Sequence, residues 1–330
     1  MSYHLGIDAG SKTIKVLVLD ENDEIVHVSY TRHRFDIKTM LIQAIHELNW
    51  RFGKIDASVC VTGSAGIGVA QACDLPFVQE VVSTTVAVQQ LFPQADAVIE
   101  LGGEDAKVIY LTGGLEQRMN ATCAGGTGGF IDNIAYMLGI KTSQVGSLSL
   151  GSTRTYPIAS RCAVFAQTDI RPLMSAGASI TDLCASTLDA VVRQVIGGLA
   201  CGRPIEGNVV YLGGPFRYVP QLAHMFTKAL NLQPRQGILP KEPHIVTVQG
   251  AAIYGKQLDN PVIINTGELE ERLKEANFED GSLPHLEPLF ESEDEIEKFQ
   301  SEHDIGLPRA RLFDASGPLY LGIDAGSTTV

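Results

Sequence analysis

The chain has 330 residues, of which 45% are hydrophobic and 19% charged. This composition supplies enough apolar side chains for buried cores and excludes a generally disordered chain. The formal net charge of −13 is concentrated in residues 258–304, where fifteen acidic residues face three basic ones, so it excludes a basic nucleic-acid surface. No apolar run approaches the roughly 18 residues of a membrane helix, and the N-terminus lacks a signal peptide pattern. We expect a cytoplasmic protein that binds neither nucleic acid nor membrane.

The predicted elements alternate between strands and helices, which is typical of an α/β protein. Residues 3–30 show the apolar alternation of three strands joined by two turns. The later elements are a helix over 39–52, a strand over 58–62, a helix over 86–91, strands over 97–101 and 106–111, helices over 130–138 and 180–201, a strand over 209–212, and helices over 219–230 and 248–258. Ser179 or Thr181 caps the helix over 180–201. The small residues of the helix over 248–258 allow close packing against a strand or a ligand.

A repeat and an acidic segment mark the C-terminal part of the chain. Leu5–Ile14 returns as Leu321–Val330 with eight of ten positions identical. We expect the chain to be the first unit of a longer tandem protein, with the start of a second unit at residues 319–330. The acidic, proline-containing stretch before it, residues 259–318, is expected to be a linker or a peripheral helical element.

The first glycine-containing turn has the pattern of a phosphate loop. Asp8 ends a strand, and the backbone N–H groups from Gly10 to Thr13 converge on one point, which is an arrangement that binds anions. We expect Asp8 to hold a metal-bound water, and Ser11, Lys12 and Thr13 to reach the β- and γ-phosphates of a nucleotide.

The second turn, Ile99–Lys107, repeats this layout of strand, acid, two glycines, acid and strand. The residues expected to bind phosphate or Mg²⁺ there are Glu100, Gly102, Gly103, Asp105 and Lys107. Glu104 or Asp105 is the expected residue that orients the attacking water. A third strand ends in Gly213-Gly214, which we expect to flank adenosine. The Walker A pattern is absent, so the three units predict a two-lobed ATPase rather than a P-loop enzyme.

Four blocks carry a resemblance to a known family: Leu5–Thr13, Ile99–Lys107, Asn120–Phe130 and Ser160–Asp169. They resemble the ATP-dependent activators of 2-hydroxyacyl-CoA dehydratases, which include the BadF/BadG/BcrA/BcrD ATPases of benzoyl-CoA reductases. The resemblance covers roughly residues 3–258 and implies the two-lobed, ribonuclease H-like fold shared by actin, hexokinase and Hsp70. We expect residues 1–112 to form the N-terminal lobe with the phosphate loops. Residues 113–258 would form the second lobe with the cysteines and the adenosine loop.

The resemblance also implies a homodimer that shares one [4Fe-4S] cluster, with Cys123 and Cys162 supplied by each subunit. The chemistry agrees, because such a cluster takes four thiolates and two per chain make half of that set. Cys123 precedes a glycine-rich helix start, where the helix dipole favours a thiolate. The remaining cysteines, by contrast, are expected to be buried or idle thiols: Cys60, Cys73, Cys184 and Cys201.

This chain departs from the family pattern at three places. Glu100 stands where the family usually has Asp, Glu104 where it has Gln, and Pro215-Phe216 where it has Val-Ala. Extra carboxylates near phosphates increase repulsion unless Mg²⁺ compensates, so we expect slow or differently timed hydrolysis. The acidic segment and the second motif resemble the large tandem members of the family.

The resemblance implies a function in which ATP hydrolysis shifts the two lobes and drives one low-potential electron to a dehydratase or reductase. An electron donor such as ferredoxin or flavodoxin is implied as a second partner. The dimer forms either between two copies or between this unit and the second unit of a longer chain. Two alternatives stay open on the residues alone: a small-molecule kinase of the same fold, for instance on a sugar, and a nucleotide-sensing assembly module.

Overall fold

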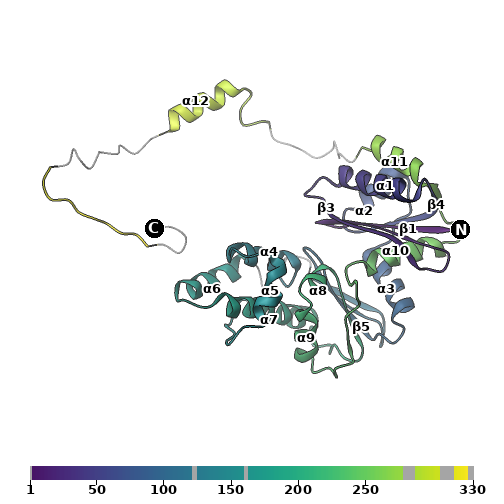
Figure 1. The fold of residues 1–330 in the computed structure, drawn as a ribbon, viewed down its shortest axis with the longest axis horizontal. Helices are drawn as coiled ribbons and strands as arrows, with labels where there is room; N and C mark the ends of the chain where they lie inside the picture. The colour runs from purple at the N-terminus through teal and green to yellow at the C-terminus, as the bar shows by residue number, and fades with distance from the viewer. Residues whose placement is uncertain (1, 121–124, 160–162, 278–286, 305–315, 326–330) are drawn as a thin grey trace. The chain divides into compact units, whose positions relative to one another are not determined.

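The computed structural model describes residues 2–120, 125–159, 163–277, 287–304 and 316–325. Its compact units are Met1–Phe278 and Glu279–Val330, each described by itself below. Figure 1 shows the first unit as two lobes.

The first lobe is built on a mixed sheet with the strand order β10-β4-β1-β2-β3. Its strands are β1 (Tyr3–Ala9), β2 (Thr13–Leu19), β3 (Ile25–Arg32), β4 (Asp56–Thr62) and β10 (Ile263–Asn265). β1, β2 and β3 form the antiparallel meander that the alternation predicts, and β4 runs parallel to β1. The outer face of this sheet is covered by α1 (Ile37–Phe52), α2 (Gly66–Cys73) and α11 (Thr266–Glu275).

The second lobe repeats the arrangement with the strand order β7-β6-β5-β8-β9. Its strands are β5 (Ala97–Leu101), β6 (Ala106–Tyr110), β7 (Glu116–Met119), β8 (Val209–Leu212) and β9 (Gly237–Ile238). One face of this sheet packs in a hydrophobic core against six helices: α4 (Gly128–Met137), α5 (Thr142–Ser149), α6 (Ala163–Ser175), α7 (Ile180–Leu199), α8 (Gly214–Tyr218) and α9 (Gln221–Ala229). β5 and β6 therefore lie in the second sheet, although the sequence places them among residues expected to form the first lobe.

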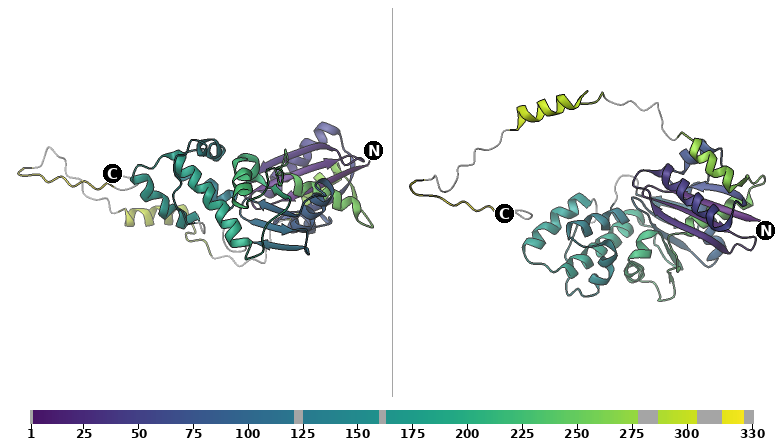
Figure 2. Two further views of the ribbon diagram at one scale, coloured as in Figure 1. Left: turned by 90° about the horizontal axis from the view of Figure 1, so that it is seen from below. Right: turned by 45° about the horizontal axis from the view of Figure 1, so that its top comes forward.

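Two helices fill the space between the sheets, α3 (Glu80–Leu91) on the second sheet and α10 (Val246–Gln257) on the first. Figure 2 shows the same layering from two further directions. A Cβ on Gly250 of α10 would lie 1.9 Å from the backbone oxygen of Ser83 in α3. A Cβ on Gly6 of β1 would lie 2.2 Å from the Val248 oxygen of α10. Glycine is thus required at Gly250, where α10 meets α3, and at Gly6, where β1 meets α10. The predicted close packing of this helix is confirmed.

Two segments differ from the sequence-based expectation. The helix expected over 219–230 is α9 over 221–229, and a short helix that was not expected, α8 (Gly214–Tyr218), precedes it. Pro220 separates the two helices, because it has no N–H to continue a helix. Within the expected acidic linker, residues 263–275 form β10 and α11, which belong to the first lobe. Leu269 and Leu273 of α11 are fully buried against that lobe. This apolar stripe is only two leucines wide, so the flanking carboxylates conceal it in the sequence.

The second unit contains α12 (Glu293–His303), which begins at a Ser292 cap and buries no residue. Residues 316–325 are described without helix or strand, although their sequence includes the start of the repeat of β1. Ser179 caps α7 by accepting from the Asp182 N–H, which decides between the two expected caps. In the described part of the chain no helix is long and apolar enough to cross a bilayer.

We expect Gly250→Ala to destabilise the protein by roughly 1–3 kcal/mol, because the added methyl group forces α3 and α10 apart. Gly197→Ala is the matched control, since a Cβ at this exposed position of α7 meets no atom within 4 Å. Alanine there should stabilise the helix slightly. Urea unfolding of both variants checks this, and equal stability of the two would contradict the close crossing.

Candidate functional site

A cleft of about 830 Å³ lies between the two lobes of the first unit. It is lined by all thirteen residues expected to bind nucleotide or metal or to orient water: Asp8, Gly10, Ser11, Lys12, Thr13, Glu100, Gly102, Gly103, Glu104, Asp105, Lys107, Gly213 and Gly214. The two expected cluster ligands, Cys123 and Cys162, lie outside the described residues. Three turns that are far apart in the sequence therefore meet at one place.

The first turn joins β1 to β2, and a buried histidine is hydrogen-bonded to its backbone. The Gly10 N–H donates to the Thr13 oxygen at 3.0 Å, which closes the turn. His33 is buried, and its Nε2 donates to the Gly10 oxygen at 3.0 Å while its Nδ1 accepts from the Phe35 N–H at 3.0 Å. Arg34 and Phe35 adopt positive φ angles of 46° and 73°, which turn the chain back toward this loop. His33 was not among the residues expected from the sequence.

A charged pair forms the floor of the cleft on the first sheet. Asp8 and Lys15 are neighbours in the β1–β2 register, and Lys15 Nζ lies 2.5 Å from Asp8 Oδ2. Burial alone would lower the pKa of Lys15, but the Asp8 carboxylate raises it above its ordinary value. One oxygen of Asp8 is therefore engaged, and the ammonium compensates its charge.

The second turn joins β5 to β6 and is supported by a buried lysine. The Gly102 N–H donates to the Asp105 oxygen at 2.7 Å. The Lys107 side chain is 4% exposed, and its ammonium lies 2.6 Å from Asp105 Oδ2 and also contacts Glu80 of α3. Burial alone would lower the pKa of Lys107, but Glu100, Glu80 and Asp105 together raise it well above its ordinary value. The pKa of Glu80 is raised, chiefly by burial.

Glu100 faces the two helices between the sheets. Its two carboxylate oxygens accept from Thr84 of α3 at 3.2 Å and from Thr247 of α10 at 3.0 Å. The two threonine hydroxyl groups lie 2.9 Å apart. Glu100 thus lines the cleft, as expected, and also connects the second sheet to both helices.

The third turn follows β8 and has an aromatic wall beside it. Gly213 has a φ of 100°, and a Cβ there would lie 2.0 Å from the Leu101 oxygen, so only glycine fits. Tyr30 of the first lobe lies near Tyr218 of α8, with ring centroids 6.3 Å apart, and near His244, with centroids 5.0 Å apart. Burial lowers the pKa of His244 to about 4, with smaller contributions from nearby cations, so the imidazole is neutral near pH 7.

The sequence of the chain matches a known protein family. The model of the BadF/BadG/BcrA/BcrD ATPase family matches residues 5–255. The chain belongs to the BadF/BadG/BcrA/BcrD ATPase family. The predicted family and its ATPase class are thereby confirmed.

Curated relatives and a solved structure agree with this assignment. The 2-hydroxyisocaproyl-CoA dehydratase activator of Clostridioides difficile is 29% identical over 76% of this chain and 94% of its own length. The (R)-2-hydroxyglutaryl-CoA dehydratase activating ATPase of Acidaminococcus fermentans is 31% identical over 64% of this chain and 82% of its own length. The activator of the 2-hydroxyisocaproyl-CoA dehydratase from Clostridium difficile with bound ADPNP has a TM-score of 0.65 at 25% identity, over 87% of this chain and 100% of that one. The expected two-lobed α/β ATPase fold is confirmed.

Several residues that line this ATPase cleft are missing from the sequence-based set: Lys15, Glu80, His244 and Thr247. The set also lacks His33 and Thr84, which bind lining residues from outside the cleft. Lys15 left a signal, since it is a charged residue within an apolar strand, two positions after Thr13. The helical residues come from α3 and α10, and no local pattern ties them to a phosphate loop.

We expect Lys107→Met to destabilise the protein by about 3–5 kcal/mol, because it leaves the buried Glu100 and the half-buried Glu80 and Asp105 without their cation. Lys228→Met, which removes an exposed lysine from α9, should change stability by no more than about 0.5 kcal/mol. Urea denaturation at pH 7.5 measures both variants. A small loss for Lys107→Met would show that the ammonium is not needed to hold the loop.

The low pKa of His244 predicts a pH-dependent stability. Below the ordinary pKa of 6.5 the unfolded chain gains a proton at this residue, whereas the folded chain does not until about pH 4. Stability from this group is therefore lost as the pH falls through that window. His244→Gln should show a smaller loss of urea midpoint between pH 7.5 and 5.5 than the wild type does. The exposed His224→Gln serves as the control for removing a histidine. If His244→Gln lost as much urea midpoint between pH 7.5 and 5.5 as the wild type, the low pKa assigned to His244 would be contradicted.

Proposed function

We propose that this chain is an ATP-dependent activator that drives single low-potential electrons to a 2-hydroxyacyl-CoA dehydratase or a related CoA-ester reductase. Its family and the names of its relatives support this function. We place ATP or ADP in the cleft, with phosphates between the first two turns and adenosine beside Gly213 and Gly214. The ADPNP bound to the related activator from Clostridium difficile supports a nucleotide at this place.

The charge of the cleft supports a requirement for Mg²⁺. Among its lining residues six are acidic and four are basic, so a polyphosphate meets net repulsion unless a cation accompanies it. Within the described part of the chain no three His, Cys, Asp or Glu side chains cluster closely enough to hold a metal by themselves. Mg²⁺ suits such a site, because it is usually held by one or two carboxylates, water and the phosphates themselves. Asp8 would bind it through water, and Glu104 or Asp105 would orient the attacking water.

The observation that carries the proposal is the attachment of the second phosphate loop to α4. The Gly128 N–H donates to the Gly102 oxygen at 2.9 Å, and the Gly129 N–H donates to the Gly103 oxygen at 2.7 Å. The first turn of α4 and the loop expected to hold phosphate are therefore one hydrogen-bonded piece. Since α4 follows the segment that contains Cys123, a shift of this loop on hydrolysis would be passed to that segment.

Both cysteine segments are anchored at described residues. Asn120 Oδ1 accepts from the Ala106 N–H of β6 at 2.6 Å, and its side-chain amide donates to the Gly125 oxygen at 3.1 Å. Asp169 of α6 accepts from the Ala159 N–H at 2.6 Å. α6 begins directly after Cys162 and packs against α4. In the sequence Cys162 directly precedes α6 and Cys123 lies five residues before α4, and the dipole at a helix start favours negative charge. These flanks support the proposal that both residues are thiolate ligands.

The described cysteines are poor cluster ligands. Burial raises the pKa of Cys60 to about 12 and that of Cys184 to about 11, and it also raises the pKa of Cys73. These three thiols are therefore protonated at neutral pH, whereas cluster ligation requires thiolates. Cys201 is exposed, and it lies after α7 rather than before a helix.

Two thiolates per chain complete a four-thiolate set when two chains meet. We therefore infer a [4Fe-4S] cluster shared across a homodimer, or across a pseudo-dimer with a second unit of a longer chain. A bound cluster would supply a one-electron carrier of low potential. The acceptor would be the dehydratase or reductase, and the donor a ferredoxin or a flavodoxin. In this chain, α4 and α6 would hold the thiolates, and the cleft would supply the nucleotide-dependent movement.

Anaerobic purification with iron and sulfide analysis tests the proposal. We expect about four iron atoms per dimer in the wild type, loss of iron in Cys123→Ser and Cys162→Ser, and retained ADPNP binding in both. Cys201→Ser, which removes an exposed thiol, is the matched control and should keep its iron. With donor and partner present, ATP hydrolysis should accompany reduction of the partner.

Three outcomes would contradict the proposal. Phosphoryl transfer to a sugar by iron-free protein would indicate a kinase of this fold. ATP binding without turnover, even with donor and partner present, would indicate a nucleotide-sensing assembly module. Iron content that is unchanged in both cysteine variants would exclude these two residues as ligands.

A further inference from the structure

Lys12 of the first phosphate loop reaches across the cleft to the second lobe. Its stem lies against Gly103, where a Cβ would be only 3.2 Å from the Lys12 Cδ. Its ammonium would lie 2.9 Å from a Cβ placed on Gly129, in the first turn of α4. The same ammonium lies 4.0 Å from Glu104 Oε1. One side chain of the first lobe therefore contacts the second phosphate loop and the start of α4.

A lysine is not a general requirement of this loop. The repeat of the motif in this same chain, Leu321–Val330, has Thr328 at the position that corresponds to Lys12. The turn itself is closed by backbone hydrogen bonding between Gly10 and Thr13, which needs no lysine. The ammonium of Lys12 thus adds a charge to a loop that closes without it.

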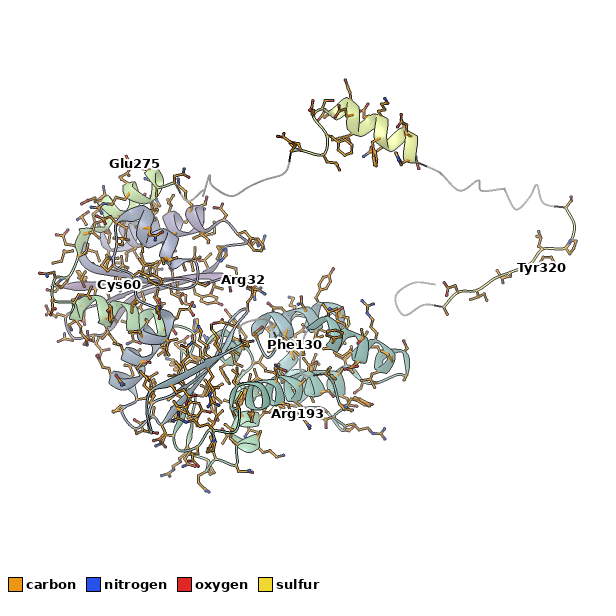
Figure 3. All side chains as sticks on the ribbon, turned by 180° about the vertical axis from the view of Figure 1, so that it is seen from behind. Arg32, Cys60, Phe130, Arg193, Glu275 and Tyr320 are labelled. Atoms are coloured by element: carbon orange, nitrogen blue, oxygen red, sulfur yellow. The ribbon has the colours of Figure 1, made fainter. Side chains whose placement is uncertain are left out.

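The pair of Lys12 and Glu104 is weak enough to be exchanged. Their side chains are 35% and 55% exposed, and exposed ion pairs contribute little to stability. Among the described lysines of the cleft, Lys15 and Lys107 are buried against carboxylates and stay bound to them. Arg32, the remaining basic residue of the lining, pairs with Asp132 of α4 at 3.4 Å, and Figure 3 shows it at the end of β3 facing the second lobe.

We propose that Lys12 exchanges Glu104 for the terminal phosphate of ATP and thereby distinguishes ATP from ADP. The ammonium lies where the two phosphate loops face each other, and a third phosphate held between these loops would lie there too. A phosphate of higher charge competes with a single exposed carboxylate, whereas ADP lacks this group and leaves the ion pair in place. The exchange also changes the partner of an ammonium that lies beside Gly129, so the surroundings of the first turn of α4 differ between the two nucleotide states. This inference rests on the ATPase assignment and is independent of the cluster.

Nucleotide affinities of four proteins test the exchange: the wild type, Lys12→Met, Glu104→Gln and the double variant. Lys12→Met keeps the stem over Gly103 and removes only the charge. Titration calorimetry measures ADPNP and ADP, each with Mg²⁺, on the full chain without added iron. We expect Lys12→Met to weaken ADPNP binding about tenfold and ADP binding much less, because only ADPNP carries the third phosphate.

Glu104→Gln separates exchange from simple repulsion. Where Lys12 is present, this variant removes both the competing carboxylate and its repulsion of phosphate, so ADPNP affinity should rise about two- to fivefold. In the Lys12→Met background it removes the repulsion alone, so the rise should be smaller. The loss caused by Lys12→Met should also shrink at high salt, because exposed charges are screened.

Three results would overturn the exchange. Equal weakening of ADPNP and ADP in Lys12→Met would mean that the side chain only shapes the loop. An equal effect of Glu104→Gln in both backgrounds would mean that the two residues act separately. A tenfold loss in Lys228→Met as well, which removes an exposed lysine of α9, would mean that net charge alone sets the affinity. Circular dichroism of each variant confirms folding, and no reading depends on iron, so the cysteine experiment stays independent.

Discussion

The close crossing of α3 and α10 is the constraint on which the site depends. Gly250 allows the backbone of one helix to meet the backbone of the other at Ser83, with Gly6 opening the first sheet beneath. Only at this short distance do Thr84 and Thr247 come within 2.9 Å of each other. Together they bind Glu100 at the end of a strand of the second sheet. The crossing of α3 and α10 thus fixes the position of one lobe against the other. The phosphate loops face each other because of this crossing.

Buried charge gives the cleft its rigidity. Removing an ammonium from water is costly, so Lys15 and Lys107 are stable at their positions only because carboxylates surround them. Lys107 links Asp105 of the second loop to Glu80 at the start of α3, so the loop and the helix are coupled by ion pairs. Asp8 and Asp105, which pair with these lysines, line the cleft in which we propose a magnesium ion. The lining of the cleft therefore has more acidic than basic residues, which suits the proposed metal-bound polyphosphate.

The sequence was sufficient for features that are local. Each glycine turn follows a strand within a few residues, so Asp8, Gly102 and Gly213 could be read directly, and all lie in one cleft. The two-lobed fold followed from the repeated pattern. What the sequence could not supply were contacts between distant elements, such as those of Thr84 with Thr247. The place of α11 was also hidden, because two buried leucines among carboxylates resemble a solvated linker.

The buried ion pairs of Lys15 and Lys107 differ from the exposed pair of Lys12 with Glu104, and this difference explains how the cleft is able to respond to a nucleotide. A site made only of buried pairs would bind phosphate without changing shape, because breaking those pairs is too costly. The exposed Lys12 differs, since its partner is replaced at little cost. Its ammonium lies against the turn where Gly128 and Gly129 are hydrogen-bonded to the second loop. The proposed exchange of partners would therefore act on a helix start that is hydrogen-bonded to the second phosphate loop.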